Sequence, residues 1–84
     1  MLFVTSMNII PGNYTRAIKL FKNPNTPEKI KIHKFLWLFG IPDAILFFEA
    51  PNEESAGEFI LQFGDVAELK TSVAFSIDKM TWMK

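Results

Sequence analysis

The chain has 84 residues, of which 49% are hydrophobic, 14% aromatic and 21% charged, and its formal net charge is zero. This composition is too apolar for a disordered chain, and the length allows one hydrophobic core and not two, so we predict a single domain over residues 1–84 with 80–84 as a tail. The absence of cysteine excludes disulfide frameworks, thiolate zinc sites and cysteine nucleophiles, and it agrees with the cytoplasmic location that we expect.

The first half of the chain carries the pattern strand, helix, strand. Residues 2–8 predict a strand that ends in a turn containing Pro and Gly. Asn13 is then placed as the N-cap of an amphipathic helix, which ends in the Pro-containing segment 23–27. The apolar face of this helix has the spacing i, i+3, i+4, i+7 and consists of Tyr14, Ala17, Ile18 and Phe21. A second strand is predicted over residues 29–39.

The segment 35–52 organises the rest of the chain. It predicts two strands joined by a hairpin turn at Ile41-Pro42-Asp43, and the second of them, 44–48, is apolar at every position. Because successive side chains of a strand point to opposite faces of a sheet, both faces of this strand need cover. We therefore expect helices on one face of the sheet and a second chain on the other.

The second half repeats the pattern of the first. Asn52 is the expected cap of a second helix, whose apolar positions each lie 42 residues after a counterpart in the first helix: Ala56, Phe59, Ile60 and Phe63. Gly64 ends this helix and a fourth strand is predicted over residues 65–77. Right-handed crossovers and short connections then favour an α+β ferredoxin-like βαββαβ fold. This fold has a four-stranded antiparallel sheet with two helices on one face and with the first and third strands in its centre.

The sheet face away from the helices would carry about five large apolar side chains from the hairpin. Burying each of them is worth about 1.5–3 kcal/mol. Leaving five in water would therefore forgo about 10 kcal/mol, which is comparable to the whole net stability of a domain. The sequence accordingly predicts a homodimer, or a higher oligomer, in which two sheets pack face to face.

The charges are unevenly distributed along the chain. Residues 1–42 hold six basic residues against one acidic, a formal charge of +5, and residues 43–84 hold three against eight, a formal charge of −5. The lysines are not interleaved with glycines and aromatic residues, so they indicate a solvated face rather than a nucleic-acid site. The most apolar segment, 35–48, is too short and too interrupted to span a bilayer. Neither nucleic acid nor a membrane is an expected partner.

Three segments of the chain resemble the GYD-domain family: residues 37–43, 48–54 and 71–75. In the Gly-x-Tyr-Asp signature of that family, Gly40 and Asp43 match, while Pro42 stands in place of the tyrosine. The resemblance covers about residues 30–77 and implies a small chain that closes a dimeric α/β barrel. The wider superfamily includes cofactor-independent monooxygenases, haem-degrading enzymes and plain binding modules, so the resemblance does not fix a function.

His33 is the first of three candidate ligand-binding residues. It is the only histidine and therefore the side chain that titrates near neutral pH without help. In a regular strand it shares a face with Phe35 and Trp37, where it would be a haem ligand or a general base. The alternative is an exposed histidine at a strand end, between Lys31 and Lys34.

Trp37 and Asp43 are the other two candidates. The ring of Trp37 suits stacking and its N–H suits orienting a ligand, whereas the alternative is a core or interface residue. Asp43 follows Pro42 in the turn, where aspartate commonly accepts hydrogen bonds from backbone N–H groups.

No catalytic residue, metal ligand set or cofactor is predicted, since no nucleophile and base recur at a usable spacing and the methionines of the tail lack His or Cys beside them. We expect a non-catalytic oligomeric module, or a module that binds a small apolar ligand between sheet and helices. The alternative is a cofactor-independent monooxygenase or haem-degrading enzyme whose pocket uses His33 and Trp37.

Overall fold

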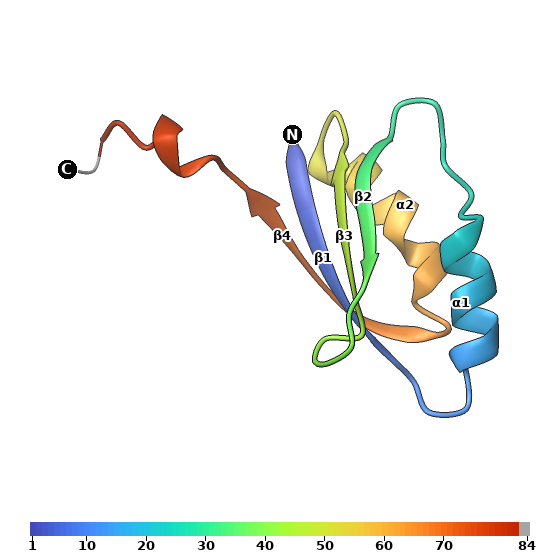
Figure 1. Ribbon diagram of the computed structural model, residues 1–84. Helices are drawn as coiled ribbons and strands as arrows, with labels where there is room; N and C mark the ends of the chain where they lie inside the picture. The colour runs from blue at the N-terminus through green and yellow to red at the C-terminus, as the bar shows by residue number, and fades with distance from the viewer. Residues whose placement is uncertain (83–84) are drawn as a thin grey trace.

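Four strands form one antiparallel sheet in the order β2-β3-β1-β4, and two helices lie on one of its faces (Figure 1). The computed structural model describes residues 1–82. The strands are β1 (Leu2–Ile9), β2 (Lys31–Trp37), β3 (Ala44–Glu49) and β4 (Ala67–Ala74). The helices are α1 (Tyr14–Lys22) and α2 (Glu53–Ile60), with short 3-10 turns at η1 (Leu61–Phe63) and η2 (Ile77–Lys79). The ferredoxin-like βαββαβ order and the central position of β1 and β3 are confirmed.

Alternating burial along the two central strands divides the sheet into a helix face and an open face. The buried positions of these strands are Phe3, Thr5, Met7, Ile9, Ala44, Leu46 and Phe48. They pack against α2 and η1, where the ring of Phe48 lies 5.1 Å from that of Phe59. Phe63 is the hub of the aromatic core, because its ring centroid lies within 5.8 Å of those of Phe21, Phe35 and Phe59. The core is therefore built largely from phenylalanine.

The two helices begin differently. At α2 the predicted cap is present, since the Oδ1 atom of Asn52 accepts the backbone N–H of Ser55 at 2.8 Å. Asn13 makes no such bond before α1, and its Oδ1 atom accepts from Arg16 instead. The predicted apolar face of α1 is only partly buried: Ala17 is in the core, whereas Tyr14 and Ile18 are exposed.

Two strands are shorter than the sequence predicts. β2 ends at Trp37, and the following loop leaves Phe39 and Ile41 almost fully exposed. β4 ends at Ala74 because its partner β1 begins at Leu2, which is the residue paired with Ala74. A strand cannot continue its ladder past the end of its only neighbour, so residues 75–82 leave the sheet.

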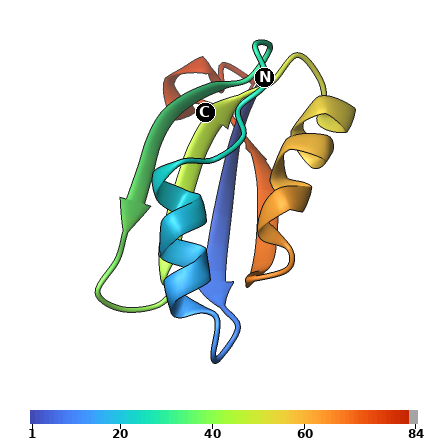
Figure 2. The same cartoon turned by 90° about the vertical axis from the view of Figure 1, so that its right-hand side faces the viewer.

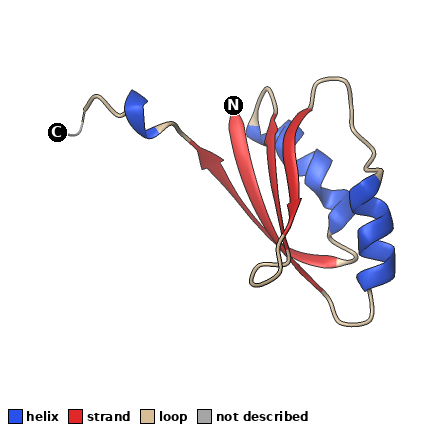
Figure 3. Ribbon diagram, in the orientation of Figure 1, coloured by secondary structure: helices blue, strands red, loops and turns tan. Residues whose placement is uncertain are grey.

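We name residues 75–82 the C-terminal arm. The arm extends away from the other three strands on the side opposite the helices (Figures 1 and 3). The radius of gyration is 13.7 Å and the longest extent is 46 Å, whereas a compact chain of this length has a radius of gyration of about 12 Å. The predicted tail at 80–84 is thus part of a longer arm, and residues 83–84 of that prediction lie outside the described residues.

Candidate functional site

The open face of the sheet carries a cluster of apolar side chains, which we name the open-face patch: Leu2, Val4, Leu36, Ile45 and Phe47. Cross-strand partners lie on the same face of a sheet, and Phe47 pairs with Val4 while Ile45 pairs with Leu36. Within residues 1–82 no helix covers this face (Figure 3). From the sequence we expected the apolar side chains of this face to come from the hairpin alone. The contribution of β1 was not predicted, although the successive apolar residues at positions 2–4 indicate a strand with two apolar faces.

Polar side chains surround the open-face patch. They are Ser6 on β1, Lys34 on β2, Glu49 on β3, and Lys70 and Ser72 on β4. An apolar centre with a polar rim is the usual anatomy of a protein–protein interface. The open face therefore has the chemistry of a contact surface rather than that of a solvated sheet face.

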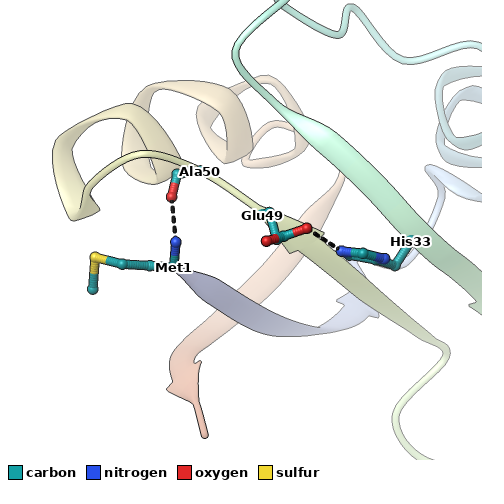
Figure 4. A network of polar contacts seen from close by, with 4 residues as sticks. All are labelled: Met1, His33, Glu49 and Ala50. Carbon is teal, nitrogen blue, oxygen red and sulfur yellow. Dashed lines mark hydrogen bonds and ion pairs between the residues drawn. The ribbon is translucent and has the colours of Figure 1, made fainter.

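His33 lies on this open face because β2 is irregular at that position. Ile32 pairs with Phe48 and Lys34 pairs with Phe47, so His33 is the extra residue of a β-bulge. Its Nε2 atom lies 2.6 Å from Oε2 of Glu49 (Figure 4). His33 therefore does not share a face with Phe35 and Trp37, as it would in a regular strand, because a bulge of one residue moves the following side chains to the opposite faces.

The pair of His33 and Glu49 sits at the end of the sheet where the chain begins. The Met1 amino nitrogen donates to the Ala50 carbonyl oxygen at 2.8 Å beside it (Figure 4). The hydrogen bond from His33 lowers the pKa of the Glu49 carboxyl from its ordinary value of 4.5, and the positive charges of His33 and Lys31 act in the same direction. Both side chains of the pair are partly exposed, so the pair belongs to the rim of the open face.

We predict that the pair of His33 and Glu49 makes the free energy of unfolding depend on pH in the acidic range. A carboxyl whose pKa is lower in the folded state stabilises the protein above its ordinary value, and this contribution is lost as the pH falls through the lowered pKa. The advantage of the wild type over Glu49→Gln in urea unfolding should therefore shrink as the pH falls below about 5. Glu58→Gln, at an exposed position of α2, is the matched control and should show no such change. A pH-independent gap for Glu49→Gln would contradict the prediction.

Trp37 lies on the helix face, in the wall of a cleft between α1 and β2. The cleft has a volume of about 420 Å³ and is lined by Ile18, Phe21, Lys22, Phe35, Leu36, Trp37 and Ala44. At this cleft Phe21, in the last turn of α1, packs on Phe63, while Ile18 one turn earlier is exposed. Lys22 is the one charged side chain of the lining, and it makes no ion pair with any of residues 1–82. The structure thus places Trp37 and His33 on opposite faces of the sheet.

Asp43 joins the hairpin to the end of β1. Its Oδ2 atom accepts the backbone N–H of Ile9 at 2.8 Å, and its own N–H donates to the Met7 carbonyl oxygen at 3.0 Å. The Leu38 N–H donates to the Asp43 carbonyl oxygen at 2.8 Å and closes the loop. The acceptor role expected from the turn is present, but the partner belongs to a strand 34 residues earlier in the chain.

Replacing Asp43 tests this structural role. Hydrogen bonds to charged groups contribute about 1.5–3 kcal/mol, so Asp43→Ala should lower the free energy of unfolding by about 2 kcal/mol in urea titrations. Asp43→Asn keeps an oxygen acceptor and should lose less. Equal losses in the two variants would mean that the bond to Ile9 contributes nothing.

The three candidate residues of the sequence are therefore not brought together by the fold. Within residues 1–82 no three His, Asp or Glu side chains gather closely enough to hold a metal ion. None of the helices in the described part of the chain is long and apolar enough to cross a membrane. Comparison with protein-family models, with curated proteins and with solved structures finds no match to this chain.

Proposed function

We propose that this chain is a non-catalytic homodimeric module in which the open faces of two copies pack together, as in a dimeric α/β barrel. The observation that carries the proposal is the open-face patch, whose five apolar side chains lie on a sheet face without cover in residues 1–82. A second copy of the same chain supplies an equally apolar surface of the same shape. Identical patches meeting about a two-fold axis are the commonest arrangement of homo-oligomers.

The energetics favour association over a solvated patch. Burying a fully exposed side chain of this kind is worth about 1.5–3 kcal/mol before the cost of association is subtracted, and each of the five gains only part of this because all are already partly covered within the subunit. That cost is about 4–15 kcal/mol for lost translation and rotation. The gain summed over the ten side chains opposes this cost, so the open-face patch favours association, and any further apolar surface buried in the contact adds to the stability of the dimer.

The geometry gives less support to the monooxygenase or haem-degrading alternative. That alternative needs His33 and Trp37 in one pocket. The bulge in β2 turns His33 to the open face, where it bonds Glu49, while Trp37 faces the cleft beside α1. A general base that acts on a ligand in the cleft would have to come from another side chain.

Sedimentation equilibrium tests the dimer. The wild type should sediment at twice the chain mass of 9.6 kDa at micromolar concentration, and it should do so equally in dilute and in 0.5 M salt because the contact is apolar. Leu61→Asp is a useful control, since Leu61 is exposed on the helix side and its replacement should not change the mass. A wild type that sediments as 9.6 kDa at hundreds of micromolar would overturn the proposal.

The cleft beside α1 favours a second function, the binding of a small apolar ligand. Its volume lies within the range of about 300–1,000 Å³ that is typical of ligand sites, and its lining combines aromatic rings with the single ammonium group of Lys22. A ligand with an aromatic ring system and one carboxylate group would match both features of the lining. The dimer proposal does not depend on this site, since the cleft lies beside α1 on the helix face and shares with the open-face patch only Leu36 of the edge strand β2.

Titration with 1-naphthylacetate, followed by tryptophan fluorescence, tests this site. Saturable binding should weaken several-fold in Lys22→Gln, whereas binding of the neutral 1-naphthylacetamide should not change. Lys19→Gln is the matched control, because Lys19 lies on the same helix outside the lining of the cleft. Absence of saturable binding by either compound would remove the ligand-binding function.

A further inference from the structure

The C-terminal arm carries large apolar side chains that its own subunit does not cover. Phe75, Ile77 and Trp82 are 57%, 81% and 66% exposed, respectively. The rings of Phe75 and Trp82 contact each other, with their centroids 5.6 Å apart, and otherwise face solvent. Three large exposed apolar side chains on an eight-residue segment are unusual for a solvated tail, in which charged and small polar residues predominate.

The arm does not simply point away from the molecule. Viewed from the helix side, it passes behind the sheet toward the N-terminal end of β2 (Figure 2). Its residue Lys79 and the open face together line a groove of about 780 Å³, whose other lining residues are Leu2, His33, Lys34, Leu36, Phe47 and Glu49. The arm therefore stands opposite the open-face patch across this groove, with Lys79 as the arm residue in its lining.

We propose that the C-terminal arm is a clasp for a second copy of this chain, which enters the space between arm and open face. In the resulting two-fold dimer each arm lies along the partner, and Phe75, Ile77 and Trp82 pack on the partner's apolar surface. This inference rests on the proposed dimer and adds to it a distinct interaction surface outside the sheet.

The size of the sheet supports the need for such a clasp. Four strands of about seven residues, at about 4.8 Å between strands and about 3.3 Å per residue, give a flat area of roughly 450 Å². A stable interface of standard size buries about 800 Å² on each partner. The β4 side of the open face is moreover polar, with Glu68, Lys70 and Ser72. The apolar part of the open face is therefore limited to β1, β2 and β3, and the arm adds apolar area to the contact.

A second copy of the chain would cover both the apolar side chains of the C-terminal arm and the open-face patch. If the arm folded back onto its own open face, it would cover the patch and leave nothing for a partner. The ladder of β4 with β1 ends at Ala74, so the arm has no strand neighbour within its own subunit to direct it there. When a second copy occupies the groove, it contacts the C-terminal arm on one side and the open-face patch on the other.

Trp82 provides a direct reporter of the clasp. The chain has two tryptophans, so Trp37→Phe leaves Trp82 as the sole tryptophan. Its emission should be shifted to the blue in the dimer and should move to the red, toward that of free tryptophan in water, when Phe47→Asp is added to dissociate the dimer. A variant that ends at Ala74 provides the second measurement. It should remain folded by circular dichroism while its dimer dissociation constant rises at least tenfold.

The outcomes separate this inference from the proposed dimer. A wild type that is monomeric at every concentration overturns the dimer and with it the clasp. A wild-type dimer whose Trp82 emission is the same as in the Phe47→Asp monomer overturns the clasp alone. An unchanged dissociation constant for the variant ending at Ala74 does the same. A blue-shifted Trp82 in the monomer means that the arm packs on its own subunit, which also contradicts the clasp.

Discussion

Leu46→Asp is expected to yield unfolded protein, whereas Phe47→Asp at the next residue is expected to yield a folded monomer. Leu46 is fully buried on the helix face between β1, β2 and the core. A carboxylate there has no partner, and an unpaired buried charge costs several kcal/mol, which is most of the stability of so small a domain. Far-ultraviolet circular dichroism should therefore show the loss of folded structure in Leu46→Asp.

Phe47 lies on the open face, where its replacement spares the core of the subunit. In the proposed dimer the part of each Phe47 side chain that is exposed in the single subunit becomes buried, which gains at most about 3 kcal/mol for each of them. Losing this burial raises the dissociation constant, and the two introduced carboxylates, which the dimer would place in an apolar contact, raise it further. Phe47→Asp should thus be folded by circular dichroism and sediment at 9.6 kDa. Two folded dimers would mean that β3 is not covered on both faces, and the dimeric barrel would have to be abandoned.

Phe63→Ala is expected to cause the largest loss of stability among variants that introduce no charge. Phe63 is fully buried and its ring meets those of Phe21, Phe35 and Phe59, so it connects α1, β2 and α2. Truncating a buried phenylalanine typically costs about 3–5 kcal/mol, because the transfer energy is lost and a cavity is left. Urea unfolding followed by circular dichroism should show a correspondingly lower midpoint.

Leu61→Ala is the matched control for Phe63→Ala. Both residues belong to the same 3-10 turn, but Leu61 is largely exposed, so its truncation should change the free energy of unfolding by at most about 0.5 kcal/mol. If the two variants were destabilised equally, the aromatic cluster would not be the hub of the core, and α1 would have to be held to the sheet by other contacts.

The order of the helices and strands could be predicted from the sequence because each of them has its own local sequence signal. The apolar spacing of the two helices, the cap at Asn52 and the two-sided apolar run of β3 depend on residues within a few positions of each other. These local signals all agree with the same order of helices and strands, and such agreement is compatible with only a few folds. The central place of β3 followed in the same way, since a strand that is apolar on both sides cannot lie at a solvated edge.

The candidate site was less predictable. Which of Leu46 and Phe47 faces the helices, and where Trp37 lies relative to His33, depend on how strands pair and not on local pattern. The bulge at His33 illustrates the point, since its neighbours read as a continuous strand and only pairing with β3 exposes the extra residue. Asp43 is similar, because its acceptor role was expected from the turn while its partner Ile9 lies on another strand.

The sequence by itself thus determined the βαββαβ order, the central strands and the presence of an apolar surplus on the sheet. Only the tertiary structure decided where that surplus lies: in the open-face patch, in the cleft beside α1 and on the C-terminal arm. The physical reason is that periodicity reports which side chains avoid water, whereas the partner that covers each of them is set by contacts between segments far apart in the chain. The end of β4 at Ala74 is the clearest case, because its position is set by where β1 begins.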